Sequence, residues 1–219
     1  AQENKYQLLI DQLKIKSHHK ILEIGCGWGG FAEYAAKKIG CRIKGITISP
    51  SQLKFAKSRI KKQGLEDKVS LELCDYRDLK GTYDRVVSIE MIEAVGEKYW
   101  LDYFKKIKQV LTKDGMAGIQ VILINDKSYD RYSNSVDFIQ RYVFPGGMLP
   151  SQQKLDENYK KTGLIEIDSN SFGKSYAKTL SIWHKDFVNS ISLIRNLGFD
   201  NKLERIFKYY FSYCKAGFS

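Results

Sequence analysis

The chain has 219 residues, of which 43% are hydrophobic and 28% charged. This length and composition are typical of one globular domain and exclude a disordered or multidomain protein. Lys and Arg number 36 against 25 Asp and Glu, a formal net charge of +11 that both halves of the chain share. No run of like charge resembles a nucleic-acid-binding tail, so we expect no nucleic acid partner.

The cysteines and histidines predict neither a disulfide framework nor a metal site. The four cysteines lack the spacing of a zinc site, and the three histidines are too scattered to share a ligand. No uncharged apolar run is long enough to span a membrane, and the first residues do not read as a signal peptide. These features favour a cytoplasmic protein.

The first 124 residues alternate between strand and helix patterns. After an amphipathic helix at 5–15, short apolar runs at 20–25, 42–49, 69–75, 83–91 and 116–124 predict strands. Helical patterns at 31–40, 51–64 and 98–111 separate them, and glycines close the first two. Strands that alternate with helices predict an α/β fold with a mostly parallel, doubly wound sheet.

The pattern changes after Asn125. Residues 125–162 mix aromatic and polar side chains with Pro145 and Pro150, which indicates a cap or substrate segment inserted into the fold. Within and beyond it we expect helices at 151–162, 176–197 and 201–216 and a strand at 164–172. We see no linker, so residues 1–219 are predicted to form a single domain.

A glycine-rich turn follows the first predicted strand. Gly25, Gly27 and Gly30 match the spacing GxGxxG, which lets a ligand approach the backbone at a helix N-terminus. A dinucleotide-binding fold would also place an acidic residue at the end of the second strand, and the sequence there is GITIS. Glu23 instead lies before the first glycine, close to where a cationic ligand would bind. This charge pattern suits S-adenosylmethionine, which has no diphosphate.

Seven segments in order resemble the cyclopropane-fatty-acyl-phospholipid synthase family, which is related to the mycolic acid cyclopropane synthases. They are ILEIGCGWGGFA, GITISPSQ, DYRDL, VSIEMIEAVG, YVFPGGMLPS, FGKSYAKTL and YYFSYCKAGF. The resemblance covers nearly the whole chain and implies the Rossmann-like fold of class I methyltransferases. It also implies S-adenosylmethionine as cofactor and an unsaturated phospholipid as substrate.

The resemblance assigns site residues position by position. Those expected to hold S-adenosylmethionine are Glu23, Gly25, Gly27, Gly29, Thr47, Gln52, Asp75 and Tyr76. The ring of Tyr76 is expected to pack on the purine. Glu93 and Tyr176 match positions that hold a bicarbonate ion used as the base, and Gln120 stands where several relatives have a histidine that contacts this ion. Without the resemblance, Glu90 and Glu93 would be equal candidates for a catalytic carboxylate.

Two segments of the family pattern are missing from the sequence. A Tyr-Ser-Cys segment that lines the family's active site has no counterpart, and neither does the antiparallel strand expected after YCKAGF. We therefore expect the sequence to be an internal part of the family's pattern. The cysteine in that last motif, Cys214, is expected to be a structural thiol, because the reaction needs no covalent intermediate.

The implied reaction adds a methylene group across a cis double bond, and the fate of the intermediate cation leaves an alternative open. Proton loss from the added methyl gives a cyclopropane, whereas a hydride shift gives a methyl-branched acyl chain. A catalytically inactive lipid- or RNA-binding relative is a third reading. The positive charge suits peripheral binding to an anionic membrane surface at the cytoplasmic side, and a homodimer is compatible with all three readings.

Overall fold

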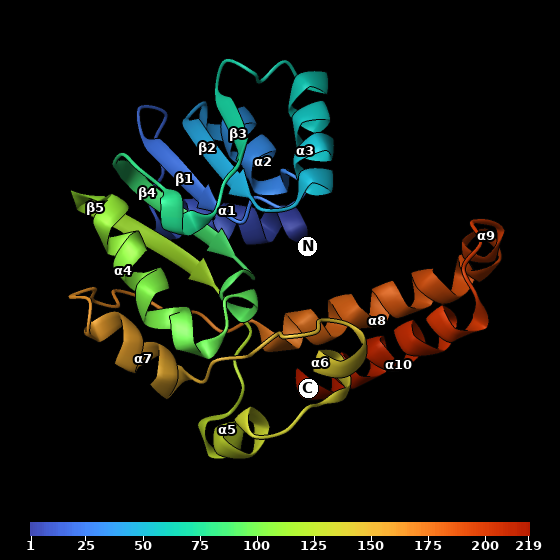
Figure 1. The fold of residues 1–219 in the computed structure, drawn as a ribbon. Helices are drawn as coiled ribbons and strands as arrows, with labels where there is room; N and C mark the ends of the chain where they lie inside the picture. The colour runs from blue at the N-terminus through green and yellow to red at the C-terminus, as the bar shows by residue number, and fades with distance from the viewer. The chain divides into compact units, whose positions relative to one another are not determined.

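The computed structural model describes all 219 residues, and it contains a five-stranded sheet (Figure 1). Its strands are β1 (Lys20–Ile24), β2 (Arg42–Thr47), β3 (Val69–Leu73), β4 (Tyr83–Ile89) and β5 (Leu111–Gln120). Their order is β3-β2-β1-β4-β5, and all neighbouring pairs are parallel. The prediction of a parallel, doubly wound α/β fold is confirmed.

Helices cover both faces of the sheet, so four of the five residues of the central strand β1 are buried. On β1, Ile21, Leu22 and Ile24 are each at most 1% exposed. One core joins the sheet to α1 (Gln2–Gln12), α2 (Gly30–Ile39) and α3 (Pro50–Lys62). The other joins it to α4 (Trp100–Val110) and α7 (Gln152–Lys160). Three short 3-10 helices follow strands: η1 (Tyr76–Asp78), η2 (Ile92–Ala94) and η3 (Glu97–Tyr99).

The strand order reverses between β1 and β4. From β1 the chain proceeds to β2 and β3 on one side, and it then returns to place β4 and β5 on the other. In open α/β sheets, ligands bind at the carboxyl ends of the strands beside such a reversal. A ligand-binding site is therefore expected at the loops after β1 and β4.

The contacts divide the chain into two compact units. The first contains Ala1–Ser135 and Gly146–Glu166, including α5 (Asp126–Ser133), and the second contains Val136–Pro145 and Ile167–Ser219. The predicted 125–162 segment has residues in both units. The interpretation of residues 1–219 as one methyltransferase domain stays a prediction.

The second unit is helical and rich in aromatic side chains. It consists of α6 (Phe138–Tyr142), α8 (Gly173–Asn189), α9 (Ile191–Asn196) and α10 (Asn201–Gly217). α8 and α10 lie side by side, with α9 at the turn between them (Figure 1). Phe187 lies 5.6 Å from both Phe207 and Phe211 between ring centres, so aromatic contacts hold the helix pair together. No helix in the chain combines the length and apolar character needed to cross a membrane.

The structure corrects the elements expected after Asn125. The strand predicted at 164–172 is wrong: this segment forms neither strand nor helix, and Ile165 and Ile167 are 84% and 76% exposed. The loop predicted before Pro150 contains two helices, α5 and α6. The helix predicted at 176–197 is divided: α8 runs from Gly173 to Asn189 and α9 from Ile191 to Asn196, because Ser190 between them has a non-helical backbone conformation (φ −97°, ψ 4°).

Candidate active site

The glycine turn joins β1 to α2 in a conformation that favours glycine. Gly25, Gly27 and Gly29 have φ values of +80°, +51° and +78°. A Cβ on Gly25 would lie 2.9 Å from Met91 Cγ, and one on Gly29 would lie 3.1 Å from Ala56 Cβ, so close packing requires glycine at both positions. A Cβ on Gly27 would meet no atom within 4 Å. The turn therefore presents an open backbone surface at Gly27, where a ligand can approach.

Glu23 lies beneath this turn, and its carboxyl is almost completely buried. Burial raises the pKa of Glu23 to about 8, and the Ala32 backbone N–H in the first turn of α2 opposes that rise. The Oε2 atom of Glu23 has no hydrogen-bond partner. Glu23 thus links β1 to α2, as expected of a side chain that orders the turn, and its contact with a cofactor stays a prediction.

Thr47 and Gln52 come together at the end of β2. The hydroxyl of Thr47 donates to Gln52 Oε1 at 3.0 Å and accepts from the Ser49 backbone N–H at 3.1 Å. Ser49 in turn caps α3 by accepting from the Gln52 backbone N–H. Carbonyl Ile46 O accepts from Gly25 N and Cys26 N at 3.0 and 2.8 Å, so the end of β2 is bound directly to the glycine turn.

Asp75 and Tyr76 follow β3 in different environments. The Arg77 guanidinium binds the Asp75 carboxylate at 2.7 and 2.9 Å and lowers the pKa of Asp75. The ring of Tyr76 is buried and packs edge-on against Tyr103, with 5.6 Å between ring centres. Stacking of Tyr76 on a purine stays a prediction, since its ring already belongs to the core around α4.

Glu93, in η2 after β4, has the character of a base. Its Oε1 atom accepts from the Ile122 backbone N–H at 2.7 Å, and its buried Oε2 atom has no partner. Burial raises the pKa of Glu93 to about 7, against the opposing Ile122 hydrogen bond. The Met148 backbone N–H donates to the Glu93 carbonyl at 2.8 Å and so fixes the loop. A carboxyl with a pKa near neutrality exchanges protons readily at physiological pH.

Glu90 contacts Gln120, a pairing that no sequence motif predicts. The Nε2 atom of Gln120 donates to Glu90 Oε1 at 2.7 Å, and the Lys5 ammonium lies 3.5 Å from the same oxygen. The Oε1 atom of Gln120 is buried without a partner. Glu90 has a φ of +51°, which is unusual for a residue with a side chain. The role predicted for Gln120, contact with a bicarbonate ion, stays a prediction.

Tyr176 lies on α8 in the second unit, where its ring is 4.8 Å from that of Phe218. Its joint action with Glu93 therefore stays a prediction. Cys214, on α10, is a poor nucleophile because burial raises the pKa of its thiol to about 11.

The residues at the carboxyl ends of the strands fit S-adenosylmethionine. The open backbone at Gly27 accommodates a ligand that an added Cβ would obstruct, and the unpartnered Glu23 Oε2 can accept a hydrogen bond. β2 ends in Thr47 and offers no carboxylate for a dinucleotide ribose. No group of three or more His, Cys, Asp or Glu side chains is placed to hold a metal ion.

Comparisons with known proteins agree on one family. The family model described as mycolic acid cyclopropane synthetase matches residues 1–219. Tuberculostearic acid methyltransferase UfaA1 of Mycobacterium tuberculosis is 38% identical over 219 residues, which are 100% of this chain and 51% of that protein. Cyclopropane-fatty-acyl-phospholipid synthase of Escherichia coli K12 is 33% identical over 100% of this chain and 54% of that protein. The chain spans about half the length of the curated relatives it matches.

Solved structures share the fold. The cyclopropane synthase MmaA2 of Mycobacterium tuberculosis superimposes with a TM-score of 0.90 at 22% identity, covering 100% of this chain and 79% of that one. Mycolic acid cyclopropane synthase CmaA1, in a complex with SAH and CTAB, gives a TM-score of 0.90 at 23% identity, with the same coverage of both chains. The predicted Rossmann-like methyltransferase fold is confirmed.

Proposed function

Because the chain belongs to the mycolic acid cyclopropane synthetase family, whose members are S-adenosylmethionine-dependent transferases that act on lipids, we propose that it forms cyclopropane fatty acids. The reaction would transfer a methylene group to the cis double bond of an unsaturated phospholipid acyl chain. One observation carries the proposal: Glu93 combines a pKa near 7 with an unpartnered oxygen. It lies two residues after Met91, the side chain against which Gly25 packs.

S-adenosylmethionine, when bound, supplies an electrophilic methyl group on a sulfonium centre. The backbone of the glycine turn would hold its methionine part, with Glu23 ordering the turn from below. Thr47 and Gln52 would contact the ribose and methionine parts, and Asp75 and Tyr76 the adenine side. Held in this way, the methyl group would be oriented toward the alkene, and exclusion of water around it would lower the barrier to attack by a weak nucleophile.

A base must follow the methyl transfer. The alkene electron pair would form the new bond to the methyl carbon while the methyl–sulfur bond breaks and its electron pair goes to sulfur, which would leave a carbocation on the acyl chain. The C–H bond of the added methyl then breaks, its electron pair closes the ring, and the proton goes to the base. We propose that Glu93 is the final acceptor of this proton, since a carboxyl with a pKa near 7 is partly ionised near neutral pH.

A bicarbonate ion is part of the proposal as the group that relays this proton. Glu93 and Tyr176 would hold the ion, with Gln120 beside it. The support for this is the residue pattern shared with the family. The Gln120 amide has two N–H groups, and one of them already donates to Glu90. The other is the group that Gln120 would use to bind the anion.

A methyl-branched product is the second candidate. It is favoured by the 38% identity to a protein named tuberculostearic acid methyltransferase, against 33% for the cyclopropane synthase of Escherichia coli. The first steps would be the same. A hydride shift followed by proton loss from a carbon of the acyl chain would form a double bond in the chain and leave the added carbon as a methyl group. The position of the base relative to the cation therefore decides the product.

We further propose that the protein works at the cytoplasmic surface of the inner membrane, as a peripheral protein. The acyl double bonds of the substrate lie in the hydrocarbon layer, and the net charge of +11 attracts anionic headgroups. This charge is the support for the membrane location.

The deciding experiment incubates the full-length protein with S-adenosylmethionine carrying a trideuterated methyl group and with a cis-unsaturated phosphatidylglycerol. Mass spectrometry of the acyl chains then reports the product. A cyclopropane retains two deuterons, because one leaves as the proton, whereas a methyl branch formed after a hydride shift retains all three. Lipid binding with no transfer at all would instead indicate the inactive relative.

Substitution of the base tests its role. We expect Glu93→Gln to bind S-adenosylmethionine normally and to lose activity by about 10²- to 10⁴-fold. Glu66→Gln, an exposed carboxylate beyond α3, is the matched control and should keep wild-type activity. Wild-type turnover by Glu93→Gln would remove Glu93 from the mechanism.

A further inference from the structure

The positive charge of the chain is concentrated in one segment. Residues 34–65 contain nine Lys and Arg and no Asp or Glu, whereas the whole chain has a net charge of +11. The net charge of each half of the chain does not show this local excess of cations. The segment runs from α2 through β2 to the end of α3, so most of its charge lies on consecutive elements of one side of the sheet.

α3 carries the largest unpaired share of this charge. Lys54, Lys57, Lys61 and Lys62 are exposed and form no ion pair, while Ala56 and Ile60 face the core. Three other cations in the segment have partners: Arg59 and Lys37 share Glu33, and Lys44 binds Glu72. Lys38 and Arg42 lie outside α3, on α2 and β2. The four lysines are therefore free to interact with an external anion.

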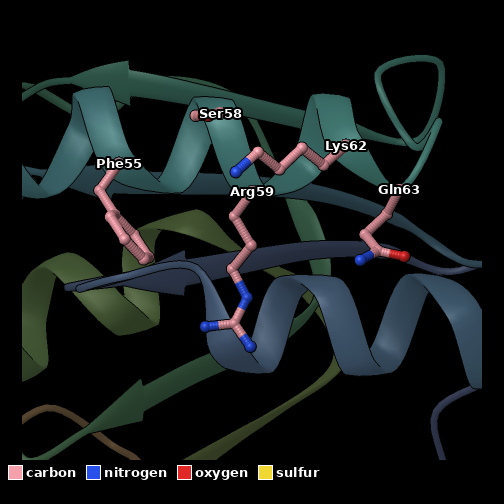
Figure 2. A pocket seen from close by; sticks show the side chains of 5 residues that line it. All are labelled: Phe55, Ser58, Arg59, Lys62 and Gln63. Atoms are coloured by element: carbon pink, nitrogen blue, oxygen red, sulfur yellow. The ribbon is translucent and has the colours of Figure 1, made fainter.

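Two exposed aromatic side chains lie beside these lysines. Phe55 on α3 is 54% exposed, Trp28 in the glycine turn is 53% exposed, and their rings meet edge-to-face at 5.3 Å. Figure 2 shows Phe55 and Lys62 along α3, lining a shallow pocket with Ser58, Arg59 and Gln63. We call Trp28, Phe55 and the four lysines the α3 surface.

We propose that the α3 surface docks on a bilayer containing anionic phospholipid. This inference deepens the proposed function and rests on it, because it names the surface through which the enzyme meets its lipid. Lysines beside exposed aromatic rings are the combination that binds a membrane interface: the ammonium groups attract headgroup phosphates, and the rings enter the boundary with the acyl chains. A single ring pair offers little for stacking successive nucleotides, so the bilayer is favoured over single-stranded nucleic acid.

The docked orientation has a consequence for the site. Trp28 lies between Gly27 and Gly29, so a ring that enters the headgroup layer carries the glycine turn to the membrane with it. The carboxyl end of β2 follows, since Ile46 O binds the same turn. The proposed cofactor site would therefore lie next to the acyl chains that it serves.

The test measures binding of the full-length protein to sedimented vesicles, either pure phosphatidylcholine or a mixture with phosphatidylglycerol. The first variant changes Lys54, Lys57, Lys61 and Lys62 to Gln. A matched control changes Lys80, Lys98, Lys108 and Lys113 to Gln; these are exposed lysines in and around α4 that form no ion pair, so the net charge falls equally. We expect the α3 variant to lose at least tenfold in affinity for the anionic vesicles and the control to lose less than threefold.

A third variant, Phe55→Ser, separates the aromatic contribution. It should reduce the part of vesicle binding that persists at high salt, while S-adenosylmethionine binding measured by calorimetry confirms that it is folded. Equal losses by both lysine variants would show that only net charge matters and would overturn the proposal. Unchanged vesicle binding by the α3 variant would also overturn the proposal. That result includes the case in which the α3 lysines bind RNA or a second copy of the chain instead.

Activity measured on two substrates distinguishes this proposal from the proposed function. If both hold, the α3 variant transfers methyl groups normally to a short-chain phospholipid in micelles and slowly to vesicles. If neither substrate reacts with wild-type protein while docking follows the α3 lysines, the proposed function fails and the docking surface stands. Equal activity of wild type and α3 variant on vesicles would count against docking through α3.

Discussion

Gly27 is the residue at which the open backbone of the glycine turn can be tested. Gly27→Val adds a branched side chain where a Cβ now meets open space, and we expect it to abolish S-adenosylmethionine binding. The control is Gly64→Val, at the end of α3, where φ is +62° and a Cβ also meets no atom within 4 Å. Both variants should lose about 1 kcal/mol or more of stability from the left-handed backbone. Calorimetry should find binding lost in the first variant only; retained affinity would place the cofactor elsewhere.

The energetic cost of the left-handed backbone at Glu90 can be measured by substitution. A side chain at a φ of +51° costs about 1 kcal/mol relative to glycine. Glu90→Ala keeps that strain and removes the acceptor for Gln120, whereas Glu90→Gly removes both. We therefore expect the Gly variant to be more stable than the Ala variant by about 1 kcal/mol in urea unfolding. Equal stability would show that the left-handed conformation relaxes once the carboxylate is gone.

The sequence located some of these residues and could not locate others. The glycines and Glu23 belong to a motif whose spacing reports a backbone turn, so their neighbourhood was predictable. The Glu90–Gln120 hydrogen bond joins the loop after β4 to the end of β5, and it depends on a left-handed backbone at Glu90. Nothing in the local sequence requires that conformation. The near-neutral pKa of Glu93 likewise follows from burial, which a sequence does not display.

Among the elements, α3 is the one whose N-terminus meets the candidate site. Ser49 caps it by accepting from the Gln52 backbone N–H at 3.3 Å, and Gln52 is also the partner of Thr47. We expect Ser49→Ala to cost about 1 kcal/mol of stability. It should also weaken S-adenosylmethionine binding, because the Ser49 side chain no longer holds the backbone of Gln52 in place. Ser58→Ala, on the exposed part of the same helix, should change neither quantity.

Four strands of the sheet were predictable because each contains a short apolar run. β5 differs from the predicted strand at 116–124, since it begins at Leu111, includes the polar residues Lys113 and Asp114, and ends at Gln120. The segment 164–172 has the same alternation and yet is not a strand. A strand needs a partner for its backbone groups as well as apolar side chains, and in this chain no other strand pairs with it. α5 and α6 were not predicted, although both form helices. Their N-cap residues, Asn125 and Asp137, stand among polar residues that are also typical of turns, so the sequence pattern indicates a loop.

For the whole molecule, Glu23 predicts a dependence of stability on pH. Its folded pKa of about 8 lies above the ordinary value of 4.5, so between these pH values the folded chain holds a proton that the unfolded chain releases. Stability from this group is complete below pH 4.5 and is lost as the pH rises through 8, by up to about 1.4 kcal/mol per pH unit. Glu93 adds the same sign up to about pH 7. Urea unfolding of Glu23→Gln should show a flatter profile than wild type, and an unchanged slope would contradict the assignment.

The first unit is discontinuous, and this has a consequence for the order in which the molecule can be completed during synthesis. β5 and α5 leave the ribosome before Val136, but α7 belongs to the same unit and follows only after ten residues of the second one. The Met148 N–H that fixes the Glu93 carbonyl also arrives late. A nascent chain that ends near residue 135 therefore has its sheet but not the hydrogen bond that completes the loop around Glu93. Reactivity at Glu93 should accordingly appear later in translation than the fold that carries it.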